Sequence, residues 1–277
     1  MNDSRDPSRI GSFTVADIER LTAGWREVPW RILPEQVLAP AFHVALDEVL
    51  TDLVARGEST PTLRFWGWAS PAVVLGRCQS VANEVDPDAA RELGMEVVRR
   101  MSGGGAMFIQ PHGAITYSLV LPEALLEGLT LRQSYEVCDA WVVLALRDMG
   151  IDCRFEPVND IACATGKIGG AAQARRRGVV LHHTTLAYAL DNAEMMRVLR
   201  IGRAKLKDKG VASAAKAVAP LERQTGLSRE AVAARLLAAF REGYGGKIGA
   251  LAAEEWTEAE TLVETKYGTA AWTHEFE

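Results

Sequence analysis

An uncharged stretch, Met101 to Pro122, places the tightest constraint on how this chain folds. It is as long as a membrane span, but its run of adjacent glycines, Gln110, Pro111 and His112 do not suit a helix that faces lipid. A segment without charge that stays out of a membrane has to be buried inside the protein. We therefore expect a soluble protein in which this stretch forms buried strands joined by a turn.

The rest of the chain shows helical and strand patterns in unequal runs. Apolar residues three and four apart predict a helix from Pro40 to Gly57, and Thr130 to Met149 is the clearest helix. Ser228 suits a helix N-cap, and Thr257 with Glu260 forms a capping-box pattern that opens the last helix. Strand-like runs lie at 62–68, 72–75, 96–100, 106–109, 114–121, 153–158, 167–175 and 179–188. Without regular βαβ alternation, this order predicts an α+β fold with a mixed or antiparallel sheet.

Composition and charge narrow the class of protein. The chain has 277 residues, 48% of them hydrophobic, enough for one large core or two smaller ones. A net charge of −5 and a single dense basic run, Arg175 to Arg177, argue against a nucleic-acid partner. None of the four cysteines has Cys-x-x-Cys spacing, and Met1 to Asp6 lacks an apolar signal region, so we expect a reducing, cytoplasmic compartment. Residues 1–28 predict a flexible or loosely docked extension before a domain over residues 29–277.

The first candidate functional segment contains consecutive glycines after Arg100, Met101 and Ser102. Adjacent glycines let a backbone turn sharply and approach a ligand without a Cβ in the way. Their N–H groups form an anion-binding concavity, and the arginines supply charge for a carboxylate or phosphate. A tight turn without any ligand is the alternative, and the spacing matches neither a P-loop nor a dinucleotide fingerprint.

The second candidate segment places Asn159 and Asp160 shortly before a glycine-rich run, Gly166 to Gln173. Lys167 lies in that run among small residues that leave room for a substrate, and its ammonium suits an acyl phosphate as that group forms or breaks. Asp160 is a candidate magnesium ligand, because hard cations prefer carboxylate oxygen. An exposed strand lysine is the alternative interpretation of Lys167.

The third candidate segment is the pair His182-His183 within a predicted strand. Neighbouring residues of a strand point to opposite faces, so both rings cannot line one pocket. The chain has five histidines and neither member of this pair has a helical i, i+4 partner, so a zinc enzyme is not indicated. A structural histidine is the default for each, and no Gly-x-Ser-x-Gly elbow indicates a serine hydrolase.

Taken in order, these segments resemble the lipoate–protein ligase and octanoyltransferase family, which is related to the biotin protein ligase catalytic domain. The resemblance runs from about Trp30 to Trp272 and includes Lys266-Tyr267 near the end. Its other blocks are residues 40–48, 63–68, 99–106, 159–161, 166–173 and 183–186. It implies an α/β sandwich with a largely antiparallel sheet flanked by helices, and a catalytic domain over residues 29–277.

The resemblance also implies a reaction. In a ligase of this family, ATP activates lipoate or octanoate to the acyl-adenylate, and a carrier lysine then attacks the acyl carbon. The expected cofactors are ATP and Mg²⁺, and the expected partners are lipoyl domains of 2-oxoacid dehydrogenase complexes or the glycine cleavage H protein. Lys167 is the implied catalytic residue and Asp160 the implied metal ligand. The implied ligand-binding residues are Arg100, Ser102, Gly103, Gly104, Gly105, Ala106, Asn159, Asp160, Gly170, Ala172 and His183.

Two segments depart from the family pattern. The residues from Ile109 to Gly113 stand where the family often has His-Asp before a glycine-asparagine turn, and His183-Thr184-Thr185 stands in place of His-Gly-Thr. Some ligases of the family carry a further C-terminal accessory domain, so either a separate accessory subunit is an additional expected partner or the enzyme works without one. Apolar character makes Leu75, Val98 and Ala172 candidates for the acyl-chain tunnel.

Two other functions stay open beside the main prediction, an ATP-dependent lipoate–protein ligase. An octanoyltransferase takes its acyl group from a carrier protein without ATP and uses a cysteine nucleophile, for which Cys163 is the candidate. The loop from Ile161 to Thr165 is shorter than in cysteine-type transferases, which favours the ligase, with Cys163 as a small buried apolar residue. The other alternative is a non-catalytic sensor that binds lipoate or its adenylate.

Overall fold

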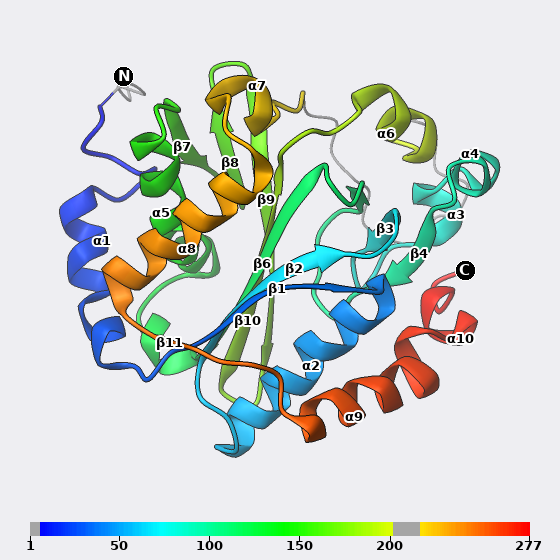
Figure 1. The fold of residues 1–277 in the computed structure, drawn as a ribbon, viewed down its shortest axis with the longest axis horizontal. Coiled ribbons are helices and arrows are strands. Elements are labelled where there is room, and N and C mark those ends of the chain that lie inside the picture. Colours follow the sequence, from blue (N-terminus) through cyan, green and yellow to red (C-terminus); the bar gives the residue numbers. More distant parts are fainter. Residues whose placement is uncertain (1–5, 202–216) are drawn as a thin grey trace.

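The computed structural model describes residues 6–201 and 217–277 and has two sheets side by side (Figure 1). The eight strands of the large sheet, in spatial order, are β11 (Lys247–Ile248), β1 (Arg31–Leu38), β2 (Thr62–Trp68), β6 (Ala114–Pro122), β10 (Val179–Ala187), β9 (Gly166–Arg176), β8 (Asp160–Cys163) and β7 (Cys153–Glu156). The three strands of the small sheet are β4 (Glu96–Arg99), β3 (Ala72–Leu75) and β5 (Met107–Ile109).

Most neighbouring strands of the large sheet run antiparallel. From β2 through β6, β10, β9 and β8 to β7 every pairing is antiparallel, whereas β1 pairs in parallel with both β2 and β11. The predicted fold, a mixed and largely antiparallel sheet flanked by helices, is therefore confirmed. The uncharged segment forms β5, β6 and the turn between them, as predicted, and β6 lies in the middle of the sheet.

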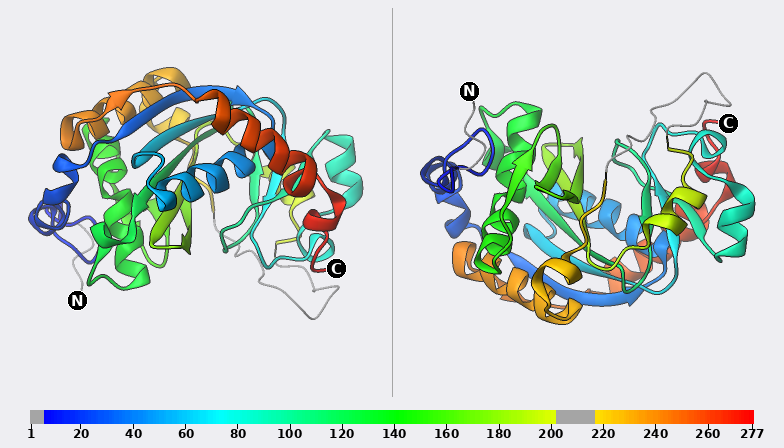
Figure 2. Two further views of the ribbon diagram at one scale, coloured as in Figure 1. Left: turned by 90° about the horizontal axis from the view of Figure 1, so that it is seen from below. Right: turned by 90° about the horizontal axis from the view of Figure 1, so that it is seen from above.

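Helices cover both faces of the large sheet, which is curved in side view (Figure 2). On one face lie α5 (Leu131–Asp148) and α8 (Arg229–Tyr244), and on the other lie α2 (Pro40–Arg56) and α9 (Ala253–Leu262). The shorter helices are α1 (Val15–Leu21), η1 (Ala23–Glu27), α3 (Val81–Glu84), α4 (Pro87–Glu92), η2 (Glu123–Leu126), α6 (Asn192–Val198), α7 (Leu221–Thr225), η3 (Val263–Tyr267) and α10 (Ala270–Thr273). Within residues 6–201 and 217–277, no helix combines the length and the apolar character that a membrane crossing requires.

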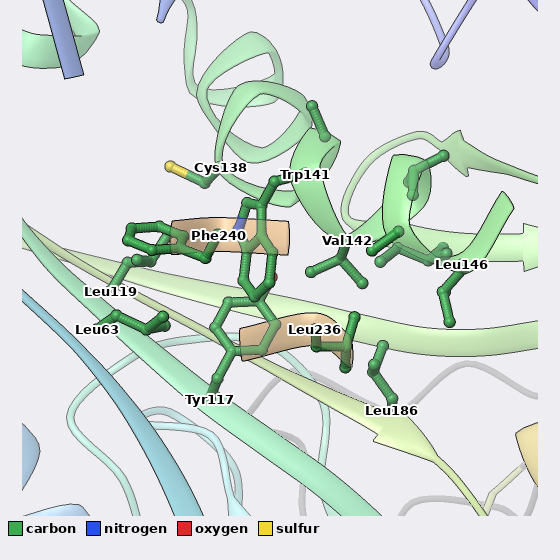
Figure 3. Close-up of a cluster of buried hydrophobic side chains, with 14 of the residues drawn as sticks. Leu63, Tyr117, Leu119, Cys138, Trp141, Val142, Leu146, Leu186, Leu236 and Phe240 are labelled. Carbon is green, nitrogen blue, oxygen red and sulfur yellow. The ribbon is translucent and has the colours of Figure 1, made fainter. Parts of the chain in front are cut away.

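The largest hydrophobic core lies between the large sheet and α5 and α8. Tyr117 of β6, Trp141 of α5 and Phe240 of α8 meet there through edge-to-face ring contacts (Figure 3). A second core lies under α2 and reaches the small sheet, so α2 packs on both sheets.

Local signals explain most helix ends. Gly57 ends α2 with a φ of 71°, a left-handed conformation that favours glycine, and Thr130 and Ser228 cap α5 and α8 through their side chains. The predicted capping box at Thr257 is wrong. Thr257 lies inside α9 and bonds to the carbonyl of Ala253 four residues earlier, while the helix begins at Ala253 itself.

The N-terminal residues are docked more tightly than predicted. Ile10 and Trp25 are completely buried, and the Phe13 amide donates to the Glu136 carboxylate of α5 at 2.7 Å. The sequence did not predict this packing, because a few buried side chains among polar residues in a short segment give no clear helical or strand periodicity. The division into an extension and a catalytic domain at residue 28 stays a prediction.

The buried N-terminal segment predicts a stability effect. Trp25→Ala should lower the free energy of unfolding by about 3–5 kcal/mol, because it removes a large buried ring from the main core. Val37→Ala is the matched control, since Val37 is 68% exposed and its truncation should change stability by only about 0.5 kcal/mol. Urea unfolding measures both variants, and equal effects would show that the N-terminal segment is not part of the folded core.

Candidate active site

A cavity of about 470 Å³ lies where the glycine-rich turn after β4, the β8–β9 hairpin and the segment after β10 meet. Gly104 and Lys167, which are far apart in sequence, both line it. A larger hollow of about 510 Å³ lies between the N-terminal segment and β7, and its wall includes none of the predicted site residues. The smaller cavity is therefore the candidate active site.

Two adjacent arginines, Arg99 and Arg100, bond to the backbone of different loops. Arg99 donates to the backbone carbonyls of Gln79 at 2.6 Å and Gly76 at 3.0 Å, and also to Trp272 at 3.0 Å near the C-terminus. Arg100 is directed to the glycine turn instead, because successive residues leave a strand on opposite faces. Arg99 thus holds the loop after β3 against the C-terminal segment, and Arg100 holds the glycine turn.

Arg100 is a buried cation on the cavity wall. Its guanidinium donates to Ser102 Oγ at 2.9 Å and to the carbonyls of Val74 at 2.9 Å and Gly105 at 2.8 Å, and no carboxylate of the described residues forms an ion pair with it. Burial lowers its pKa to about 10, so it stays charged at neutral pH. A buried charge that carbonyl dipoles solvate favours a ligand that carries or develops negative charge.

Gly104 occupies a position that only glycine suits. Its φ is 88°, and an added Cβ would lie 3.1 Å from Arg100 Nη2. The same Cβ would lie 4.0 Å from the Ala172 Cβ of β9, so the turn approaches the large sheet closely. On the other side, a Cβ at Gly76 would lie 2.0 Å from the Gly104 carbonyl oxygen, which leaves no space for a side chain there.

A chain of buried hydrogen bonds runs beneath the turn. Asp47 accepts from His183 Nδ1 at 2.9 Å, and since the carboxylate is an acceptor, Nδ1 has to carry the proton. The other ring nitrogen then accepts from Ser102 Oγ at 2.6 Å, and that oxygen accepts from Arg100. Burial lowers the pKa of His183, which keeps the ring neutral as this arrangement requires.

Arg64 completes this network on the far side of Asp47. It donates to Asp47 Oδ1 at 2.6 Å and to His43 Nδ1 at 2.8 Å, so the His43 ring donates through Nε2 to the Gly67 carbonyl. Burial alone would raise the pKa of Asp47, but the Arg64 charge and the His183 hydrogen bond hold it below its usual value. Burial, helped by Arg64, lowers the pKa of His43 to about 3.

Lys167 also lines the cavity. Its Nζ lies 2.7 Å from Asp160 Oδ1, and its side chain is 33% exposed whereas that of Asp160 is 5% exposed. A Cβ at Gly170 would lie 2.4 Å from Nζ, so this glycine makes room for the lysine itself. The lysine backbone is fixed by bonds to Ala217 and Ala219, each 2.8 Å long. The ammonium is thus held in place and open to the cavity.

The structure separates the predicted ligand residues into two groups. Arg100, Gly104, Gly105, Ala106, Asn159, Asp160, Lys167, Gly170 and Ala172 line the cavity. Ser102 and His183 do not line it; they are buried beneath the turn and hold its shape. Gly103 belongs to the turn but does not line the cavity either. Of the predicted tunnel residues, Ala172 lines the cavity, Val98 is buried in the second core under α2, and Leu75 is buried in a third core at the small sheet.

The cavity residues do not form a magnesium site by themselves. Asp160 is the only acidic side chain on the described cavity wall, and Lys167 is already paired with it. Nowhere in residues 6–201 and 217–277 do three side chains capable of holding a metal gather. The role of Asp160 as a magnesium ligand stays a prediction, and in the structure its carboxylate is paired with Lys167.

None of the four cysteines lines the cavity. Cys138 and Cys153 are buried, and burial raises the pKa of the Cys153 thiol to about 12. Cys163 packs against the core on the α5 side of the sheet, and its Sγ lies 3.1 Å from Thr165 Oγ1. Cys78 is exposed on the loop after β3.

Comparison with known proteins places the chain in a family. The model of the lipoyl protein ligase A/B catalytic domain matches residues 39–241. The chain belongs to this family. The octanoyltransferase LipM of Symbiobacterium thermophilum is 31% identical over 275 residues, which span 89% of this chain and 98% of the relative. The octanoyltransferase LipM of Kyrpidia tusciae is also 31% identical, over 88% of this chain and 98% of its own length.

A solved structure of the same fold supports this placement. Protein Ta0514 from T. acidophilum, determined with bound lipoic acid, has a TM-score of 0.74 and 26% identity. The match covers 88% of this chain and 98% of that chain. The predicted family is therefore confirmed, and the chain is an enzyme of protein lipoylation chemistry.

The predicted main function is wrong. We expected an ATP-dependent lipoate–protein ligase, whereas the curated relatives that match over nearly their full length are named octanoyltransferases. The loop around Cys163 misled the prediction, because it is shorter than the loop of cysteine-type transferases and so favoured the ligase. Lipoylation and acyl transfer remain as the supported chemistry.

The neutral buried histidines predict lower stability in acid. The native pKa values of His43 and His183 lie below the ordinary 6.5, so the unfolded chain binds more protons below that pH. The free energy of unfolding should therefore be highest above about pH 6.5 and fall as the pH drops. For His43, whose native pKa is about 3, the loss between pH 7 and pH 5 should be about 2 kcal/mol.

Urea unfolding at several pH values measures this dependence. His43→Asn should remove the part of the pH-dependent loss in unfolding free energy that comes from His43, even if the substitution also changes stability at pH 7. His274→Asn is the control, since that side chain is 53% exposed and its substitution should leave the pH dependence unchanged. A wild-type stability that does not change between pH 7 and pH 5 would contradict the neutral assignment.

Proposed function

We propose that this chain is an octanoyltransferase that moves an octanoyl group from a carrier-protein thioester to a lysine of a lipoyl domain. The observation that carries the proposal is that one cavity combines an apolar wall with the paired Lys167 and Asp160 side chains. The near full-length likeness to octanoyltransferases supports the acyl group, and the family description supports a lipoyl protein as acceptor. Lipoyl domains of 2-oxoacid dehydrogenase complexes and the glycine cleavage H protein are the acceptors we propose.

The cavity suits an acyl chain with a reactive carbonyl at one end. Met107, Phe108 and Met195 contribute apolar side chains to the wall, together with Leu190, Leu199 and Ile201. The charged groups, Arg100, Asp160 and Lys167, lie on other parts of the wall. A hydrocarbon tail gains by leaving water for the apolar part, while the carbonyl stays near the cations.

In the proposed step, the acceptor lysine amine attacks the thioester carbon. A carbon–nitrogen bond forms, and the carbonyl oxygen becomes an oxyanion that the Lys167 ammonium stabilises, with Arg100 adding positive potential. The Asp160 carboxylate accepts the proton that the amine loses. The carbon–sulfur bond then breaks, the thiolate takes up that proton, and the products are an amide and a free carrier thiol.

This step needs no covalent cysteine intermediate. Cys163 does not line the cavity and packs on the α5 side of β8. Its thiol therefore does not face an acyl carbon bound in the cavity. We therefore propose direct transfer between the two carriers in place of a Cys163 acyl-enzyme. ATP and Mg²⁺ belonged to the predicted ligase reaction, and the proposed transfer uses neither.

Intact-mass analysis of a lipoyl domain tests this function. Purified protein with octanoyl carrier protein and no ATP should add one octanoyl group to the acceptor lysine. Lys167→Ala should slow the transfer about a hundredfold or more, as loss of an oxyanion-stabilising group does. Gly170→Ala should also slow it, because the new methyl would lie 2.4 Å from Lys167 Nζ and the ammonium has to move.

Control variants separate this mechanism from its rivals. Cys163→Ala should transfer at the wild-type rate, and so should Gly243→Ala, where an added methyl has open space. Loss of transfer in Cys163→Ala would overturn the direct step while leaving the transferase assignment. Product that forms only when ATP is present, or binding without any product, would overturn the proposed function.

A further inference from the structure

Gln110 stands in the segment that departs from the family pattern, and the proposed reaction gives it no role. It lies in the turn between β5 and β6, where the chain segment after β10 crosses. An added Cβ at Gly113 would lie 3.0 Å from the Ala189 carbonyl oxygen, so the two segments touch at backbone level. The side chain of Gln110 is therefore positioned to act on the segment that follows Ala189.

Helix α6 in that segment forms part of the apolar cavity wall. Met195 of α6 lines the cavity, and so do Leu190 before the helix and Leu199 after it. Phe108 of β5 lines the cavity as well. Met195 is half-buried and has a flexible, unbranched side chain that adapts to the shape of a ligand.

The two ends of α6 are held in different ways. At its C-terminal end, backbone bonds fix the chain: the Asp86 amide donates to Val198 at 2.8 Å, and the Arg200 amide donates to Glu84 at 2.9 Å. At its N-terminal end, Gln110 Oε1 accepts from the Asp191 amide at 2.9 Å.

The amide of Gln110 makes a second bond at this end. Its Nε2 donates to Glu194 Oε2 at 2.7 Å, one residue before Met195. Gln110 thus contacts α6 with both of its amide atoms, through bonds that are exposed or only partly buried. Backbone bonds of Tyr188 and Ala189 to the Gly113 carbonyl hold the chain before α6, and Gln110 supplies the side-chain bonds at the start of the helix itself. Loss of the Gln110 bonds should therefore loosen this end of α6.

We propose that Gln110 is a positioning residue that sets the depth of the acyl cavity by holding α6, so that acyl chain length is selected at Met195. The proposal rests on the proposed function, because it takes the ligand of this cavity to be an acyl chain. With α6 held in place, Met195 limits how far the tail extends. When the Gln110 bonds are lost, the wall recedes and longer chains fit.

A matched pair of methionine variants tests the wall. Met195→Ala should raise the kcat/KM for decanoyl relative to octanoyl transfer by about tenfold, since discrimination of one or two methylenes is in this range. Met196→Ala removes the same atoms from the neighbouring position of α6, where the side chain is 46% exposed, and should leave the ratio unchanged. Equal ratios in the two variants would overturn the assignment of Met195.

An exchange of charges tests Gln110. Gln110→Glu places a carboxylate against Glu194 and should shift the chain-length ratio toward decanoyl, mainly through KM. Adding Glu194→Gln to that variant restores an amide and a carboxylate that can bond, and should return the ratio to the wild-type value. A ratio that is unchanged in Gln110→Glu, or a shift that Glu194→Gln does not reverse, would overturn the proposal.

Calorimetric binding of octanoate, decanoate and dodecanoate separates this inference from the proposed function. If the wild type binds these acids but transfers no acyl group, the transferase assignment fails while the cavity can still be tested. In that case Met195→Ala and Gln110→Glu should still shift the binding preference toward the longer acids. If both variants keep the wild-type order of affinities, the inference about α6 fails even when transfer is normal.

Discussion

The site depends on a buried chain of hydrogen bonds that runs from Arg100 through Ser102 and His183 to Asp47. This chain joins the glycine turn to β10 and α2, and Arg64 of β2 balances the charge of Asp47 at its far end. Removing one member of a buried ion pair leaves a charge without compensation, which costs about 3–5 kcal/mol. The turn is therefore held from beneath by buried groups, and its other side faces the cavity.

Small residues decide where the charged groups lie. Gly76 and Gly104 let two loops approach at backbone level, and Gly170 gives Lys167 the space beside Asp160. The result is a cavity with an internally solvated guanidinium on one wall and a paired ammonium on another. Such an arrangement stabilises negative charge that develops on a bound carbonyl oxygen, which an acyl transfer requires.

Much of this architecture could be predicted from the sequence, and the reasons for the failures are physical. Periodicity and end signals located α2 and α5, and strand alternation predicted that His182 and His183 face opposite sides, as their bonds to Asp139 and Asp47 show. Strand β8 was missed because four residues are too few for a period. Burial places Ser102 and His183 beneath the turn, away from the cavity wall, which only the fold shows, and their contact with a ligand stays a prediction.

The central claim is that the glycine turn, Lys167 and the apolar wall at α6 serve one acyl chain. A crystal structure of the protein with bound octanoate tests it most directly. The account predicts density in the cavity of about 470 Å³, with the carboxylate near the Lys167 ammonium and the tail against Met195. Octanoate bound with its tail away from α6, or in the hollow between the N-terminal segment and β7, would contradict the account.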